Sequence, residues 1–493
     1  MYFAILKKVK PTVLTPTEEN DLQLWMPVLL GLLAYIFVNV NYNIYYIDDA
    51  WVISNIWNTT KLGIAKDLVF IEPGDNGYVQ YFGATYAFIM GNILNLLGWT
   101  KSNVFLVNST FVWGTAIVWY HLVRQLPFSK NIANLTLAFL PIFPPFFFAA
   151  HCGRPEAFTT FIISLQLLLF IRKRYFLSAF LTGFAFEAHI MGAAGLFFLL
   201  AYSIYKKEDL LFNKQAFWKM FLHFTLGGMT AIGYYFAIHG SHFSLAELTM
   251  LITENRDMGT PLNNYILNYF MNYDWYSRIW EFALFLAGIT IYFRKGIFKG
   301  NRFLTILVMV LLISTIITHR ENKNYFVYIF PAFILLYFYT AEQLKMLKKF
   351  SLALTITMGL YYGLHFYFNS NYDFEKLVLD TKKELKDNTL PVVGVPDFWF
   401  AAMDKNFIPI HNRKELSLRS LDKFYLIQSD YLEWRCKEYD RTMSYYKKNY
   451  NATLVKELDT FKGEKIRIWQ CKKPAQVLPK LAKQETLGWG ISE

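Results

Sequence analysis

Apolar runs recur along the chain from residue 25 to residue 369, and this recurrence constrains the possible folds more than any other feature. The first run, residues 25–47, is long enough to cross about 30 Å of hydrocarbon as a helix. The 493-residue chain is 54% hydrophobic and only 17% charged, whereas about a quarter of the residues in a soluble protein are charged. The sequence therefore predicts a polytopic α-helical membrane domain.

The positive charge is distributed as in a membrane protein. A net charge of +12 is compatible with nucleic-acid binding, but the Lys and Arg residues cluster between the apolar runs. The positive-inside bias places such clusters in the cytoplasm. We therefore expect the lipid bilayer, and no nucleic acid, as a partner. The N-terminus (MYFAILKKVK) has no small-residue cleavage site, so the first span is interpreted as an uncleaved anchor.

Placing the basic clusters in the cytoplasm predicts the topology. Residues 1–24 are then cytoplasmic, and an odd number of spans, about eleven, leaves the C-terminal region on the opposite face. Residues 79–97 are apolar enough to span, but a span there would move every later cluster to the wrong side. We interpret this segment as a membrane-hugging helix of the first external loop, with twelve spans as the alternative. The predicted spans after the first lie near 103–122, 131–149, 157–171, 175–187, 190–205, 216–239, 279–293, 303–318, 323–340 and 351–369.

Beyond residue 370 the composition becomes that of a soluble domain. The runs PVVGVPDFWFAA and KFYLIQSDYL resemble strands, and YLEWRCKEYDRTMSYYKK has helical periodicity. ATLVKEL and EKIRIWQ, separated by a turn, indicate a pair of strands. We predict a membrane domain at 25–369, a small external α/β domain at 370–475 and a weakly ordered tail at 476–493. Cys436 and Cys471 can pair if this domain faces an oxidising compartment, or remain free thiols.

Polar residues gather in the loops predicted to be external. The first loop carries Asp48, Asp49, Glu72, Asp75 and Tyr78, and shorter loops carry HCGRPE (151–156), EAH (187–189) and HRENK (319–323). The apolar run PIFPPFF is a predicted broken helix without a counterpart elsewhere. Two adjacent acids at the exit of a span indicate chemistry on a lipid-borne head group. The alternative is that Asp48 and Asp49 cap the next helix.

The first loop resembles that of the GT-C superfamily, in particular polyprenyl-phosphate-sugar-dependent glycosyltransferases of the bacterial mannosyl- and arabinofuranosyltransferase type. The matching pieces are Asp48-Asp49-Ala50, the stretch Asn58 to Gly63, Glu72-Pro73-Gly74-Asp75 and the 79–97 segment. HCGRPEAF and NKNYFVYIFPAF fit later parts of the same pattern. The chain departs from it at Asn-Thr-Thr-Lys (58–61), where many relatives have an Arg-rich helix, and at Tyr81-Phe82, where small hydroxyl residues are frequent; both departures concern the identity of the sugar.

The resemblance implies transfer of a sugar from a polyprenyl phosphate to a glycan, lipid or protein acceptor on the non-cytoplasmic face of a bacterial inner membrane. Because phosphate is a good leaving group, the reaction needs a base for the acceptor proton and no strong acid. In the resembled family the first acid of the pair usually has this role, which implies Asp48 as base and Asp49 as orienter. The alternatives are Asp49 as base, or two helix-capping acids. Glu156 is the implied counterpart of a second acidic residue.

The leaving phosphate needs cations on the same face. Candidates by topology are Arg154, His189, Arg320 and Lys323. Each also has a structural interpretation: Arg154 paired with Glu156 or a lipid phosphate, His189 hydrogen-bonded in its turn, and Lys323 snorkelling. Asp48, Asp49 and Glu156 can also supply oxygen ligands to Mn²⁺ or Mg²⁺, and the sequence does not decide between that and no required cofactor.

Two other classes of function compete with this prediction. A multi-span transporter of a lipid-linked or small polar substrate would show internal repeats, charges within spans or matched broken helices. A membrane-anchored binding or assembly protein would not require the elaborate first loop. The grouping of polar residues on one face favours the glycosyltransferase.

Overall fold

The computed structural model divides into two compact units, each described here by itself. The first comprises residues 1–44, 55–66 and 79–371, and the second comprises residues 45–54, 67–78 and 372–493. The structure describes residues 47–62, 66–67, 78–79, 83–240, 287–318, 327–369, 374–386, 389–394, 396–403, 405–409, 421–429, 446, 448–459 and 465–474.

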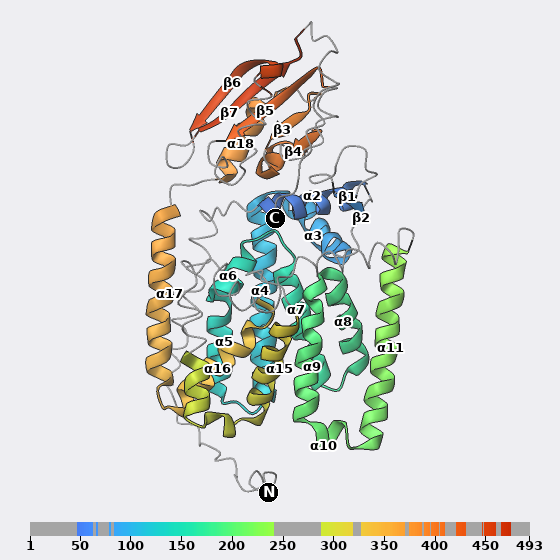
Figure 1. Cartoon of the computed structure of the whole chain (residues 1–493), viewed down its shortest axis with the longest axis vertical. Coiled ribbons are helices and arrows are strands. Elements are labelled where there is room, and N and C mark those ends of the chain that lie inside the picture. Colours follow the sequence, from blue (N-terminus) through green and yellow to red (C-terminus); the bar gives the residue numbers. More distant parts are fainter. Residues whose placement is uncertain are drawn as a thin grey trace. The chain divides into compact units, whose positions relative to one another are not determined.

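The first unit is a bundle of helices that run side by side (Figure 1). Helix α2 (Ile47–Leu62) begins in the second unit and ends in the first, and the short strands β1 (Lys66–Asp67) and β2 (Tyr78–Val79) follow it. The later elements of the first unit are α3 (Ala84–Leu97), α4 (Lys101–Gln125), α5 (Lys130–Phe139), η2 (Leu140–Ile142), α6 (Pro144–Ala150), α7 (Glu156–Ile171), α8 (Tyr175–Ala188), η3 (Ile190–Ala193), α9 (Ala194–Tyr205), α10 (Lys207–Leu210), α11 (Lys214–His239), η4 (Ile297–Lys299), α15 (Arg302–Thr318), α16 (Phe330–Gln343) and α17 (Leu347–Asn369).

Helix α7 lies at the centre of the bundle, where it packs against α4, α8 and α9. Its core contacts include a polar one, because the Trp119 indole of α4 donates a hydrogen bond to Ser164 Oγ of α7 at 2.8 Å. The same indole packs edge-on against the Phe198 ring of α9, with ring centroids 5.8 Å apart. A buried indole N–H needs such a partner, so the pair fixes the register between α4 and α7.

The predicted broken helix is confirmed. The α5–η2 segment and α6 meet at an angle of 51°. Pro144 and Pro145 stand at the break, where a proline lacks the N–H for a helical hydrogen bond and its ring clashes with the preceding turn. The bend carries the chain into the turn 151–155 ahead of α7.

Among the described residues, one helix is long and apolar enough to cross a membrane alone: α11, whose apolar side chains are largely exposed. The bent α5–α6 pair makes a second if it counts as one span. The total of about eleven spans stays a prediction. Helix α3 has 14 residues, about 21 Å of helix, which is shorter than the hydrocarbon core. This length supports the interpretation of residues 79–97 as a helix of the first loop.

The second unit contains a mixed sheet. Its described strands are ordered β4 (Phe407–Pro409), β3 (Val392–Gly394), β5 (Lys423–Ser429), β7 (Lys465–Lys472) and β6 (Asn451–Asp459). Strand β3 pairs parallel with β4 and β5, and β7 pairs antiparallel with β5 and β6. Helix α18 (Phe374–Glu384) packs against β6 and against the 3₁₀ helix η6 (Pro396–Ala401).

The C-terminal strand pair is confirmed, and the strand predicted for PVVGVPDFWFAA is only partly correct. The strand ends at Gly394, and DFWFA forms η6. Pro396 explains the difference, because proline cannot donate to a sheet ladder. The segment predicted to be helical after residue 430 lies mostly outside the described residues.

Glu457 and Cys471 of this sheet have shifted pKa values. Lys465 and Arg467 hydrogen-bond the Glu457 carboxylate of β6 and hold the pKa of that carboxyl below its ordinary value. Cys471 is buried, and burial raises the pKa of its thiol to about 12. Cys436 lies outside the described residues, so the pairing of these two cysteines stays a prediction.

Candidate functional site

The acid pair lies in the first turn of a helix. Helix α2 begins at Ile47, which makes Asp48 and Asp49 its second and third residues. The positive end of the helix dipole favours carboxylates there, so a helix-stabilising role and a chemical role are compatible. Further along α2, Ala50, Ile53 and Ile56 are buried, which fixes the helix against its surroundings.

Helices α2 and α3 pack closely within the first unit. The Trp57 ring of α2 packs edge-on against Trp99, which follows α3, with centroids 4.8 Å apart. Gly91 of α3 lies directly against Thr60 of α2: a Cβ at position 91 would stand 1.9 Å from Thr60 Oγ1. Thr60 is held in this rotamer by its hydrogen bond to Ile56 O at 2.7 Å. Glycine at position 91 therefore sets the distance between the helices of the first loop.

Replacing Gly91 with Ala is expected to separate α2 from α3. Overpacking of this kind costs about 1–3 kcal/mol, and the unfolding midpoint of the detergent-solubilised protein should fall. Thr60→Ala removes the closest atom, so the double variant should recover most of the loss. Gly228→Ala on α11 is the matched control, since a Cβ there meets nothing within 4 Å. Equal midpoints for G91A and G228A would contradict this account of the packing.

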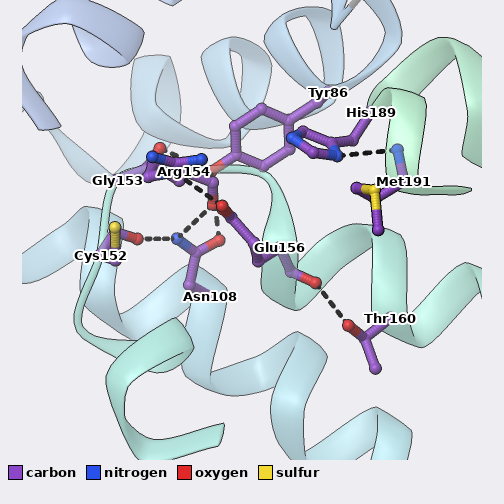
Figure 2. Close-up of polar contacts among 9 residues, drawn as sticks. All are labelled: Tyr86, Asn108, Cys152, Gly153, Arg154, Glu156, Thr160, His189 and Met191. Carbon is purple, nitrogen blue, oxygen red and sulfur yellow. Dashed lines mark hydrogen bonds and ion pairs between the residues drawn. The ribbon is translucent and has the colours of Figure 1, made fainter. Parts of the chain in front are cut away.

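The turn between α6 and α7 holds a buried ion pair. Arg154 Nε donates to Glu156 Oε1 at 2.6 Å, and the two side chains are 10% and 4% exposed (Figure 2). Glu156 is the first residue of α7, where the helix dipole also favours its charge. Of the two structural interpretations of Arg154, the structure has the pair with Glu156.

Tyr86 and Asn108 connect this turn to the first loop. The Tyr86 hydroxyl of α3 lies 3.1 Å from Gly153 O, 3.3 Å from Arg154 O and 3.2 Å from Asn108 Oδ1 (Figure 2). The Asn108 amide of α4 donates to Cys152 O. These contacts give three backbone carbonyls of the turn a side-chain hydrogen-bond partner, and buried carbonyls require partners. The structure thus brings the 79–97 segment and the HCGRPE turn together.

His189 lies in the connection between α8 and α9. Its Nδ1 accepts a hydrogen bond from Met191 N at 3.1 Å (Figure 2). Its ring also stacks on Tyr328, with centroids 5.8 Å apart. An accepting Nδ1 places the proton of the neutral imidazole on Nε2. The hydrogen-bonded interpretation of His189 is therefore what the structure has, and it leaves Nε2 as the ring's donor.

Several predicted site residues are not placed by the structure. Glu72, Asp75, Arg320 and Lys323 lie outside the described residues, and of Asp48, Asp49 and Tyr78 only the backbone is described. Because the acids belong to the second unit and Arg154 to the first, their convergence stays a prediction. No group of three His, Cys, Asp or Glu residues suited to a metal occurs within the described part, and the metal hypothesis for Asp48, Asp49 and Glu156 stays open.

Sequence reasoning missed Tyr86 and Asn108. Asn108 gives a signal in retrospect, because a polar amide inside a predicted span must find a partner. Tyr86 gives none, since tyrosine is common in apolar segments. A cavity of about 20 Å³ beside the same turn, lined by Ser109, Trp113 and His151 among others, is large enough for about one water molecule.

Solved structures identify the fold. No family model matches the sequence, and no curated protein sequence matches it. The chain is similar to ArnT from Cupriavidus metallidurans in the apo state, with a TM-score of 0.59 and 10% identity over 90% of this chain and 97% of that chain. The same protein bound to undecaprenyl phosphate gives 0.60 and 11%, over 91% and 98%.

An archaeal protein shows the same likeness. The oligosaccharyltransferase AglB from Archaeoglobus fulgidus, in complex with an inhibitory peptide and a dolichol-phosphate, gives a TM-score of 0.51 and 12% identity, over 93% of this chain and 75% of that chain. ArnT and AglB are GT-C glycosyltransferases. The chain therefore shares the fold of ArnT and AglB, which is the fold that the resemblance of the first loop implies.

Proposed function

We propose that this chain is an integral-membrane glycosyltransferase that moves a sugar from a polyprenyl-phosphate donor to a glycan, lipid or protein acceptor. The observation that carries the proposal is the fold shared with ArnT bound to undecaprenyl phosphate over 91% of this chain. The hydrogen bonds from Tyr86 to the backbone of the Arg154 turn support it, because they join two segments that the sequence assigns to the site. The site faces the non-cytoplasmic side, opposite the basic loops.

The proposed reaction is a single displacement at the anomeric carbon. The acceptor oxygen attacks as the bond to the donor phosphate breaks, and its proton passes to the Asp48 carboxylate, with Asp49 orienting the group. The phosphate leaves as an anion, so its charge must be met by Arg154, His189, Arg320 or Lys323. Glu156 would set the direction of the Arg154 guanidinium, since it already binds Nε. If a divalent cation participates, the carboxylates of Asp48, Asp49 and Glu156 would supply its oxygen ligands.

The test is transfer from defined donors. Membranes containing the protein should move radiolabelled sugar from hexose- or pentose-bearing undecaprenyl phosphate to an acid-stable product. The double variant Asp48→Asn/Asp49→Asn should give only background, and the donor that reacts identifies the enzyme as a hexosyl- or pentosyltransferase. Uptake of labelled solutes into sealed vesicles is measured in parallel. Uptake without transfer from any donor would replace this proposal with the transporter.

A further inference from the structure

A buried carboxylate from a distant part of the chain caps the N-terminus of α3. Glu187 lies one residue before the end of α8, and its side chain is 1% exposed. Its Oε1 accepts from Ala84 N at 2.9 Å and its Oε2 from Thr85 N at 3.0 Å, while its carbonyl accepts from Gly83 N at 2.6 Å. The residue that precedes α3 is Gly83, with φ 93°, which has no side chain to cap the helix. Glu187 therefore does what an N-cap side chain does elsewhere.

Helix α11 orients this carboxylate. His239, the last residue of α11, has its Nε2 3.1 Å from Glu187 Oε1, and its side chain is 3% exposed. One turn earlier, the Tyr235 ring packs on the His239 ring with centroids 4.7 Å apart. The Tyr234 hydroxyl shares a hydrogen bond with Thr85 Oγ1 at 2.7 Å. The first turn of α3 is thus held by α8 and α11 together.

Tyr86, the next residue of α3, links the start of the helix to the Arg154 turn. Tyr86 follows Thr85 directly, and its hydroxyl contacts the backbone of the Arg154 turn. Six residues after Thr85, Gly91 lies against Thr60 of α2. A shift at the start of α3 must therefore move either the ion-pair turn or the packing of α2, because closely packed helices transmit strain.

We propose that Glu187, oriented by His239, is a positioning residue for the transfer reaction: it fixes α3, and through Tyr86 and Gly91 the two segments assigned to the site. This inference rests on the proposed function. Apolar packing would serve a purely structural role at a lower cost in free energy, since a buried carboxylate with a polar partner seldom stabilises a fold more than hydrophobic residues of the same shape. What a carboxylate adds is the simultaneous placement of two backbone N–H groups and one imidazole.

The test uses kinetics with matched variants. Glu187→Gln keeps the shape but turns an amide N–H₂ towards one of the donors, and His239→Leu removes the imidazole donor. Each should lower kcat by about ten- to hundredfold, because misplacement by about 1 Å costs that much, while the KM for the lipid donor changes little. His239→Gln retains an N–H at similar reach and should recover most of the activity that H239L loses. His223→Leu, an exposed residue of the same helix, is the control.

Hydrogen exchange separates this inference from the proposed function. Exchange of the peptide that covers the start of α3 should accelerate in E187Q and H239L but not in H223L. If the wild type transfers no sugar, faster exchange in E187Q and H239L still supports the capping of α3 by Glu187, and only the proposed function fails. Unchanged exchange in E187Q and H239L would contradict the capping of α3 by Glu187. Equal kcat values for H239Q and H239L would overturn the positioning role, as would loss of folded protein in both, since that outcome assigns the pair to stability alone.

Discussion

Replacing Asp48 with asparagine is expected to reduce sugar transfer by about 10²–10⁴-fold while the protein still inserts and folds. General-base catalysis contributes a factor of this size, and an amide cannot accept the acceptor's proton. The change conserves shape and leaves the first turn of α2 intact, so expression should not fall. The measurement is the initial rate of transfer from the undecaprenyl-phosphate donor that the wild type uses.

Asp49→Asn is the matched variant, one residue further along the same turn. We expect a smaller loss, about tenfold, if Asp49 orients its neighbour. A near-wild-type rate for D48N together with an inactive D49N would move the base to Asp49. Full activity of both single variants would leave the acids with the helix-stabilising role alone and remove the proposed mechanism.

Replacing Arg154 with methionine is expected to destabilise the first unit by about 3–5 kcal/mol. The change leaves the Glu156 carboxylate buried without its guanidinium partner, and breaking one side of a buried pair carries a penalty of this size. The unfolding midpoint in detergent, followed by tryptophan fluorescence, should fall well below that of G91A. Binding of the lipid donor should weaken as well if Arg154 also meets the leaving phosphate.

The double variant Arg154→Met/Glu156→Gln separates stability from chemistry. It removes both charges, so most of the lost stability should return, because a neutral pair of similar volume leaves no buried charge without a partner. Transfer should stay low if the guanidinium serves the phosphate. A double variant that regains both stability and activity would show that the ion pair only stabilises the turn, and that Arg154 does not bind the leaving phosphate.

The sequence anticipated the fold because its signals are periodic or local. Apolar runs bounded by basic clusters predict membrane helices whatever their tertiary packing, and the first loop indicated the GT-C fold that the solved structures share. The break at Pro144 and the strand pair at the C-terminus follow equally from local chemistry. The error at DFWFA has a local cause too, since Pro396 cannot donate to a sheet ladder and the strand ends before it.

The sequence could not anticipate how the site is held together. Arg154 and Glu156 are two residues apart, but an exposed pair would have the same spacing, and only packing against the surrounding helices buries it. Tyr86 reaches a turn 67 residues away, and Glu187 reaches the start of α3 over 103 residues. No local pattern encodes such contacts, because they depend on which helices become neighbours.

Sequence alone therefore determined the helical class of the protein, and it predicts a membrane domain with its polar residues on one face, because hydrophobicity and charge act residue by residue. Tertiary structure alone decided the partners of those polar residues: an arginine that lies against a glutamate, and a glutamate that closes a distant helix. The physical reason is that burial makes each unsatisfied polar group costly, and the fold determines which groups are near enough to satisfy it.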